Sequence, residues 1–79
     1  MNRSIALILA GGIGSRMNLT VPKQFAVVDG LTVLQHTMLA FQRHQLVSAI
    51  YVVASPQWSE TVRQQALEAG ISKFASCLD

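Results

Sequence analysis

Several features that mark other protein classes are scarce in this sequence of 79 residues. Its single cysteine, Cys77, cannot form an internal disulfide and favours a reducing cytoplasm. Only 13% of the residues are charged, and the six lysines and arginines are scattered, which excludes the basic stripe of a nucleic-acid-binding protein. The apolar run at residues 5–9 is too short to cross a membrane and precedes no signal-peptide cleavage site. We therefore expect a cytoplasmic protein that binds neither nucleic acid nor a membrane.

Hydrophobic residues, in contrast, are abundant for so short a chain, at 51%. A doubly wound α/β domain usually has about 100–150 residues, and a domain of roughly 60 residues buries only about 60% of its unfolded surface. We therefore expect apolar faces that additional chain would cover. We interpret residues 1–79 as the N-terminal portion of a single larger domain.

Three apolar segments predict the strands of a sheet. Residues 4–10 are apolar on both faces, which is typical of a buried strand in a parallel sheet, and we expect this strand to be central. Residues 49–54 are β-branched and apolar, and residues 73–78 form a third such segment. A short strand at residues 26–28 is expected before a turn at Asp29-Gly30.

Two predicted helices separate these strands. Thr32 and Gln35 form a capping-box pattern, and apolar residues at helical spacing follow it to about His44. The second helix is predicted to begin with Ser55 as its N-cap and a proline at its first position, and to end at Gly70. The order strand–helix–strand–helix–strand predicts an α/β fold with a parallel sheet and right-handed crossovers.

A glycine-rich loop follows the first strand, with the sequence Leu9-Ala10-Gly11-Gly12-Ile13-Gly14-Ser15-Arg16-Met17. Its glycines permit positive φ and remove the Cβ atoms that would keep a ligand away from the backbone. Successive N–H groups of residues 10–14 can then point at one anion. Arg16 and Lys23 place two of the chain's six cations beside this loop. We therefore predict a phosphate-binding loop at the carboxyl end of the first strand, where open α/β sheets bind ligands.

The spacing within this loop separates it from two better-known phosphate loops. Met17 stands where the third glycine of the dinucleotide-binding fingerprint belongs. A Walker loop needs Gly-Lys-Ser/Thr, whereas Lys23 lies nine residues after Gly14. Phosphoryl or nucleotidyl transfer requires positive charge where negative charge builds up on phosphate oxygens. We expect Arg16 to supply it through its guanidinium fork, and Lys23 as a point charge.

The other polar side chains are weaker candidates for a site. His36 and His44 have no companion ligands in the sequence, so we expect local hydrogen bonding and not a metal site. Asp29 precedes a glycine and fits a turn. Trp58 at helical spacing fits the core better than a substrate contact, and Cys77 fits a buried strand position. Because no convincing set of carboxylates for Mg²⁺ is present, we predict no metal ligand within this chain.

The loop, together with Pro22-Lys23-Gln24-Phe25, resembles the signature of the cytidylyltransferases that act on methylerythritol phosphate and on ribitol 5-phosphate. The resemblance continues at residues 34–37 and 56–58 and so spans nearly the whole chain. It implies a Rossmann-like nucleotidyltransferase fold and transfer of CMP from CTP to a polyol phosphate, with release of pyrophosphate. The pair Leu9-Ala10 before the two glycines resembles the branch that acts on D-ribitol 5-phosphate.

The resemblance also implies roles and partners that the residues alone do not reveal. It implies that Arg16 and Lys23 stabilise the transition state. The residues that it implies for nucleotide binding, with Gly14 added from its place in the loop, are Leu9, Ala10, Gly11, Gly12 and Gly14. It implies Mg²⁺ as the cofactor, with its protein ligand beyond residue 79, and a homodimer for the full-length protein. We therefore expect residues 1–79 to be inactive alone.

Three functions remain open at this point. The first is CMP transfer to D-ribitol 5-phosphate, and the second is CMP transfer to 2-C-methyl-D-erythritol 4-phosphate in isoprenoid biosynthesis. The third is a non-catalytic fragment that binds a nucleotide or phosphate. Assays with a panel of nucleotides and acceptors separate the first two, whereas the third predicts binding without turnover.

Overall fold

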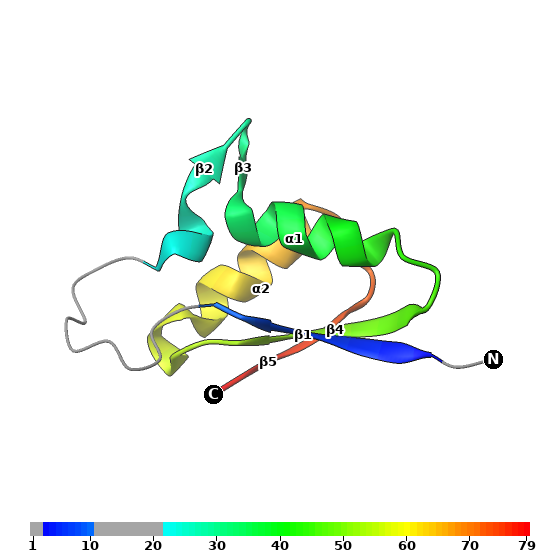
Figure 1. Cartoon of the computed structure of the whole chain (residues 1–79). Helices are drawn as coiled ribbons and strands as arrows, with labels where there is room; N and C mark the ends of the chain where they lie inside the picture. The colour runs from blue at the N-terminus through cyan, green and yellow to red at the C-terminus, as the bar shows by residue number, and fades with distance from the viewer. Residues whose placement is uncertain (1–2, 11–21) are drawn as a thin grey trace.

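The computed structural model describes residues 3–10 and 22–79, which form a three-stranded parallel sheet with two helices on one of its faces (Figure 1). The strands are β1 (Ser4–Leu9), β4 (Val47–Val53) and β5 (Phe74–Leu78), and the helices are α1 (Val33–Gln42) and α2 (Ser59–Glu68). Two 3₁₀ turns and a hairpin complete the described chain: η1 (Lys23–Phe25), η2 (Pro56–Trp58), β2 (Val27–Val28) and β3 (Leu31–Thr32). The predicted α/β fold with a parallel sheet is confirmed.

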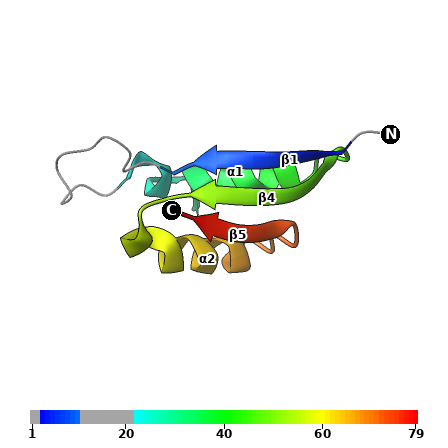
Figure 2. The ribbon, with the colours of Figure 1, turned by 90° about the horizontal axis from the view of Figure 1, so that it is seen from below.

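The sheet has the strand order β1-β4-β5, with β1 and β5 both parallel to β4. The prediction that the first strand is central is therefore wrong for the part of the chain that the structure describes. Both faces of β1 are apolar, but only one of them packs under the helices, and the other is left open by every described element. Figure 2 shows this open face from below.

Helix α1 begins at the capping box that the sequence predicted. The Gln35 N–H donates to Thr32 Oγ1 at 3.0 Å, and the Thr32 N–H donates to Gln35 Oε1 at 2.9 Å. These bonds satisfy backbone donors that the start of a helix otherwise leaves open, and such a cap contributes about 1 kcal/mol. Leu34 and Met38 follow at helical spacing and are fully buried, so α1 buries one apolar face.

Helix α2 begins later than the sequence predicted. Residues 56–58 form η2, and the α-helix starts only at Ser59. Ser55 is the N-cap residue of this 3₁₀ turn, as predicted, but its side chain makes no capping hydrogen bond. Its backbone carbonyl instead accepts from the Trp58 N–H at 2.9 Å and closes the 3₁₀ turn. The proline at the first turn position fits the prediction, since a proline lacks the N–H that would otherwise need a partner there.

Helix α2 ends just before Gly70, the glycine that the sequence predicted as its C-terminal cap. Gly70 has a φ of +69°, which a residue with a side chain rarely adopts. The Gly70 N–H donates to the Leu67 carbonyl at 3.1 Å, and the Ile71 N–H donates to the Ala66 carbonyl at 3.0 Å. This pair of bonds is a Schellman motif, and it turns the chain back toward β5.

The hydrophobic core lies between the two helices and one face of the sheet. Its fully buried large side chains are Leu34, Met38, Ile50, Val52 and Val62. A polar link joins the helices beside this core: Thr32 Oγ1 donates to Gln65 Oε1 at 2.6 Å, and Gln35 Nε2 donates to the Gln65 carbonyl at 3.1 Å. None of the helices in the described ranges is long and apolar enough to span a membrane.

The hairpin of β2 and β3 projects away from the sheet (Figure 1). Asp29 and Gly30 have φ values of +53° and +83°, so both central turn residues have the positive φ of a tight hairpin turn. The predicted turn at this pair is confirmed, whereas β3 was not predicted. His36 of α1 lies against the hairpin, with its Nε2 2.6 Å from the Val28 carbonyl oxygen.

Candidate nucleotide-binding site

The carboxyl ends of the parallel strands lie side by side, and we call this end of the sheet its carboxyl edge. Strand β1 ends there at Leu9 and β4 ends at Val53, and these two residues are partners in the strand register. The Ala10 N–H donates to the Val53 carbonyl at 2.8 Å, so the ladder continues one residue past β1. Ala10 is fully buried and its N–H already has a partner, so a contact between Ala10 and a nucleotide would need another of its atoms. Open α/β sheets bind their ligands outside this edge.

Lys23 lies in η1, which returns to this edge after the glycine-rich segment. Pro22 before it is buried and extended, with φ −55° and ψ 145°, and its carbonyl accepts from the Phe25 N–H at 3.0 Å. Lys23 itself is exposed. The short turn therefore fixes the backbone of Lys23 while its ammonium group stays accessible to an anionic ligand.

Gln24 connects this turn to the end of the first strand. Its Nε2 donates to the Leu9 carbonyl at 3.4 Å, although fifteen positions separate the two residues. Its Oε1 is buried and has no hydrogen-bond partner among the residues that the structure describes. Of the predicted site residues, the structure thus brings together Lys23 and the Leu9-Ala10 pair. The sequence reasoning missed this role of Gln24, since a single amide between a cation and an aromatic residue has no distinctive pattern.

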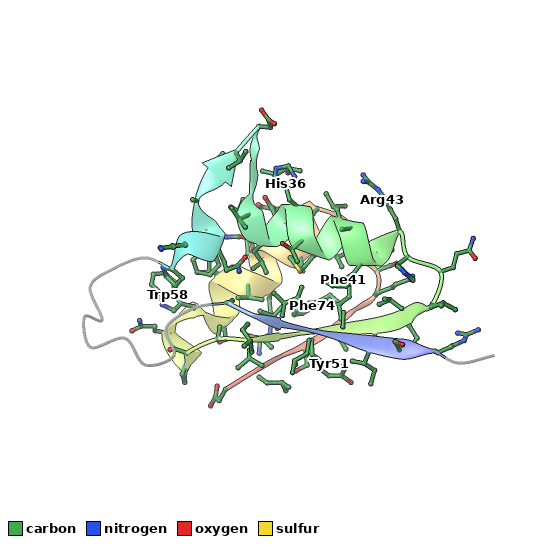
Figure 3. All side chains as sticks on the ribbon, in the orientation of Figure 1. His36, Phe41, Arg43, Tyr51, Trp58 and Phe74 are labelled. Atoms are coloured by element: carbon green, nitrogen blue, oxygen red, sulfur yellow. The ribbon has the colours of Figure 1, made fainter. Side chains whose placement is uncertain are left out.

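An aromatic pair anchors η1 from its other end. The rings of Phe25 and Trp58 lie 5.3 Å apart between centroids at an angle of 55°, a tilted geometry that aromatic pairs favour. Both side chains pack against the core, and Trp58 comes from η2, which follows β4 (Figure 3). The prediction that Trp58 belongs to the core is confirmed. The turn that carries Lys23 is thereby held to two strand ends, by Gln24 at β1 and by Phe25 at β4.

The remaining predicted site residues, Gly11, Gly12, Gly14 and Arg16, lie outside the described residues. Their roles as phosphate cradle and second cation stay predictions. The described residues on either side of them, Leu9 and Gln24, lie together at the carboxyl ends of the strands, since Gln24 Nε2 donates to the Leu9 carbonyl.

Both histidines are locally hydrogen-bonded, as predicted. His44 Nδ1 accepts from the Leu46 N–H at 3.2 Å, and His36 contacts the hairpin. Among the described residues, no group of three or more His, Cys, Asp or Glu side chains is placed to hold a metal ion.

Cys77 lies in β5 and packs partly against the core. Burial raises the pKa of its thiol, an effect that the Arg63 guanidinium opposes and the Asp79 carboxylate reinforces. A thiol with a raised pKa is a weak nucleophile near neutral pH. This placement agrees with the predicted structural role of Cys77.

Sequence comparisons now add to this geometry. The chain is 43% identical over 73 residues to the bifunctional ribulose 5-phosphate reductase/CDP-ribitol pyrophosphorylase of Haemophilus influenzae, covering 92% of this chain and 14% of that protein. It is 37% identical over 68 residues to the ribitol-5-phosphate cytidylyltransferase of Lacticaseibacillus paracasei, covering 86% of this chain and 29% of the relative. It is also 37% identical over 79 residues to the 2-C-methyl-D-erythritol 4-phosphate cytidylyltransferase of Chlorobaculum parvum, covering 98% and 32% respectively.

The chain thus spans about a third or less of the length of these curated relatives. Relatives named for ribitol phosphate and for methylerythritol phosphate match it at similar identity, so the comparisons identify the family and not the acceptor. The model of the 2-C-methyl-D-erythritol 4-phosphate cytidylyltransferase family matches residues 4–74, which include all three strands of the sheet at least in part and both helices. With the parallel sheet and the position of Lys23, this match shows that the chain belongs to the 2-C-methyl-D-erythritol 4-phosphate cytidylyltransferase family.

Proposed function

We propose that this chain supplies the triphosphate-binding part of an enzyme that transfers CMP from CTP to D-ribitol 5-phosphate. A phosphate oxygen of the acceptor would attack the α-phosphorus of CTP, and the bond from that phosphorus to the oxygen bridging to the β-phosphorus would break. Pyrophosphate would leave with the electron pair. The observation that carries the proposal is the exposed Lys23, held by Gln24 beside the end of β1 in a chain of this family.

Each residue of the proposed site has a distinct task. The N–H groups of residues 11–14 would bind the phosphates, because the N–H of Ala10 already serves the sheet. Lys23 and Arg16 would stabilise the negative charge that builds up on the phosphate oxygens in the transition state. Neither needs to remove a proton, since the attacking phosphate oxygen is already ionised. Bound Mg²⁺ would add positive charge at the triphosphate, with protein ligands outside this chain.

D-Ribitol 5-phosphate is favoured as acceptor by Leu9-Ala10 before the glycine pair and by two relatives named for ribitol. 2-C-Methyl-D-erythritol 4-phosphate is the second candidate, since the matching family and several relatives carry its name. The proposal places the reaction in the cytoplasm, and a homodimer is proposed for an enzyme of full length. Residues 1–79 alone are proposed to be inactive, because they span only 29% of the ribitol relative.

Two hybrid enzymes test this proposal. In the ribitol hybrid, residues 4–74 of this chain replace the corresponding segment of the Lacticaseibacillus paracasei relative, and in the methylerythritol hybrid they replace that of the Chlorobaculum parvum relative. Pyrophosphate release is measured with CTP, Mg²⁺ and each acceptor. We expect turnover by the ribitol hybrid within about tenfold of its parent, a larger loss in the methylerythritol hybrid, and none by the chain alone.

Each other outcome has a defined meaning. The reverse order of the two hybrids would favour the methylerythritol acceptor. Folded hybrids that both release no pyrophosphate would contradict the enzymatic proposal, and CTP binding by the chain alone would then leave a non-catalytic nucleotide-binding fragment. Robust turnover by the chain alone would contradict its proposed inactivity.

A further inference from the structure

Gln24 contacts the last peptide group that the structure describes before the glycine-rich segment. The N–H of this group, which belongs to Ala10, donates to the Val53 carbonyl of β4 at 2.8 Å. In a planar trans peptide the N–H and C=O point in opposite directions, so the Leu9 carbonyl points away from β4. On that side β1 has no neighbouring strand in the described part of the chain, and the carbonyl accepts from Gln24 Nε2 at 3.4 Å. The sheet therefore holds this peptide group on one side and Gln24 holds it on the other.

Gln24 also belongs to η1, the turn that carries Lys23. A 3₁₀ turn has three residues per turn, so the side chains of consecutive residues leave its axis about 120° apart. The direction of Gln24 toward β1 therefore sets the direction in which Lys23 leaves the turn. Lys23 is exposed, and its ammonium group is carried by a flexible four-carbon stem. The region that this ammonium can reach thus depends on how η1 itself is held.

Two other contacts hold η1, and both lead away from β1. The Ala26 carbonyl accepts from the Val33 N–H at the start of α1 at 2.9 Å, and Phe25 contacts Trp58 of η2. Among the described residues, the bond from Gln24 is the side-chain hydrogen bond that joins η1 to β1. Apolar ring contacts are not directional, whereas a hydrogen bond is. The orientation of the turn toward the end of β1 therefore depends on the Gln24 amide.

The same contacts of Gln24 contribute little to stability. Its bond to the Leu9 carbonyl, at 3.4 Å, is longer than the roughly 2.7–3.2 Å typical of N–H···O bonds. Its Oε1 is buried without a hydrogen-bond partner among the described residues, and such an atom has lost its water without compensation. Gln42 offers a contrast, since its Nε2 donates to Ser72 Oγ at 2.7 Å and its Oε1 accepts from the Lys73 N–H at 3.0 Å. Both ends of the Gln42 amide are thus satisfied.

We infer that Gln24 is a positioning residue for the proposed reaction, which fixes Lys23 relative to the Leu9–Ala10 peptide group without a net gain in stability. This peptide group precedes the glycine-rich residues, and Lys23 is the cation proposed for the transition state. Gln24 therefore joins two parts of the proposed site. A misplacement of about 1 Å can cost a reaction about a hundredfold in rate. A residue that breaks a rule of stability fits a functional site, where such exceptions gather. The inference rests on the proposed function.

The test makes the same substitution at the two glutamines, in the more active of the two hybrids, which we expect to be the ribitol hybrid. Gln24→Met keeps the length of the side chain and removes both polar atoms. We expect kcat for pyrophosphate release to fall about 10–100-fold, with KM for CTP changed less than about threefold, because Lys23 acts in the transition state. Tm should stay within about 2 °C. Gln42→Met is the matched control: Tm should fall by about 4 °C, since two short hydrogen bonds are lost, and kcat should change less than about twofold.

A second comparison shows whether Gln24 acts through Lys23. In a Lys23→Ala hybrid the ammonium group to be positioned is absent, so adding Gln24→Met should lower the remaining kcat less than about twofold. A general disturbance of packing would instead lower kcat by the same factor with and without Lys23.

Three results would overturn the inference and leave the proposed function intact. The first is a kcat of the Gln24→Met hybrid within about twofold of that of the unsubstituted hybrid. The second is an equal fold-loss from Gln24→Met in the presence and absence of Lys23. The third is a fall in Tm as large as that from Gln42→Met, because Gln24 would then serve stability. If neither folded hybrid releases pyrophosphate without these substitutions, the proposed function itself is contradicted, and the inference falls with it.

Discussion

The two faces of β1 have nearly the same chemistry and very different surroundings. Ala6 and Ile8 are each 6% exposed beneath the helices, whereas Leu7 and Leu9 between and beyond them are 60% and 57% exposed. The apolar sequence of β1 therefore shows that both faces are suited to burial. It does not show which of the two faces the described elements cover. Only the packing of α1 and α2 decides that. One face of β1 therefore contributes to the stability of the described residues, and the other stays exposed on their surface.

Truncating adjacent residues of β1 should reveal the largest difference between its two faces. Ile8→Ala should lower the free energy of unfolding of the chain by about 2–5 kcal/mol, because it leaves a cavity beneath the helices. Leu7→Ala should lower it by about 0.5 kcal/mol, as for an exposed substitution. Urea denaturation followed by circular dichroism measures both values. Similar losses at the two positions would mean that the open face is already covered, for instance by self-association.

A smaller effect is expected from the polar link on the covered side. Thr32→Ala removes the cap of α1 and the hydroxyl that donates to Gln65, and should cost about 1–2 kcal/mol. Thr32→Ser keeps a hydroxyl and is the matched control, for which we expect most of this loss to be recovered. Urea denaturation followed by circular dichroism measures the free energy of unfolding of both variants. Equal stability of Thr32→Ala and the unsubstituted chain would show that the Thr32 hydroxyl contributes nothing measurable to stability.

The smallest effect concerns thiol reactivity on the two faces of β5. Burial raises the pKa of Cys77, so less thiolate is present at a given pH, and its alkylation should reach full rate only at a higher pH than that of a free thiol. Ser76 neighbours Tyr51 in the strand register, and Figure 3 shows Tyr51 on the open face of the sheet, away from both helices. In a Cys77→Ser, Ser76→Cys variant, we expect iodoacetamide to react several-fold faster at pH 8. Faster reaction at Cys77 would contradict the assignment of faces.

Short sequence patterns were sufficient to predict where several elements begin, turn or end. The start of α1 at Thr32, the turn at Asp29-Gly30 and the end of α2 at Gly70 each depend on residues within about four positions of one another. Backbone donors at such points must find a partner nearby, so short patterns report them well. At Ser55 the N-cap position was predicted, but the 3₁₀ turn at residues 56–58 and the missing side-chain hydrogen bond were not.

Long-range features could not be predicted in this way. The edge position of β1 depends on β4, which follows more than thirty residues later. In the candidate site, the loop pattern and the cation Lys23 were evident from residue types. The bond from Gln24 to the Leu9 carbonyl and the contact of Phe25 with Trp58 were not, because both depend on how the chain folds back. These two contacts are what place Lys23 at the carboxyl edge.

The kcat for pyrophosphate release by the ribitol hybrid, with and without Lys23→Ala, tests the central claim most directly. Losing a cation that stabilises the transition state should lower kcat about 10²–10³-fold. Arg43→Ala is the matched control, since this exposed cation lies at the C-terminal end of α1 (Figure 3), and its removal should change kcat less than about twofold. Unchanged kcat in a folded Lys23→Ala hybrid would contradict the account of the site.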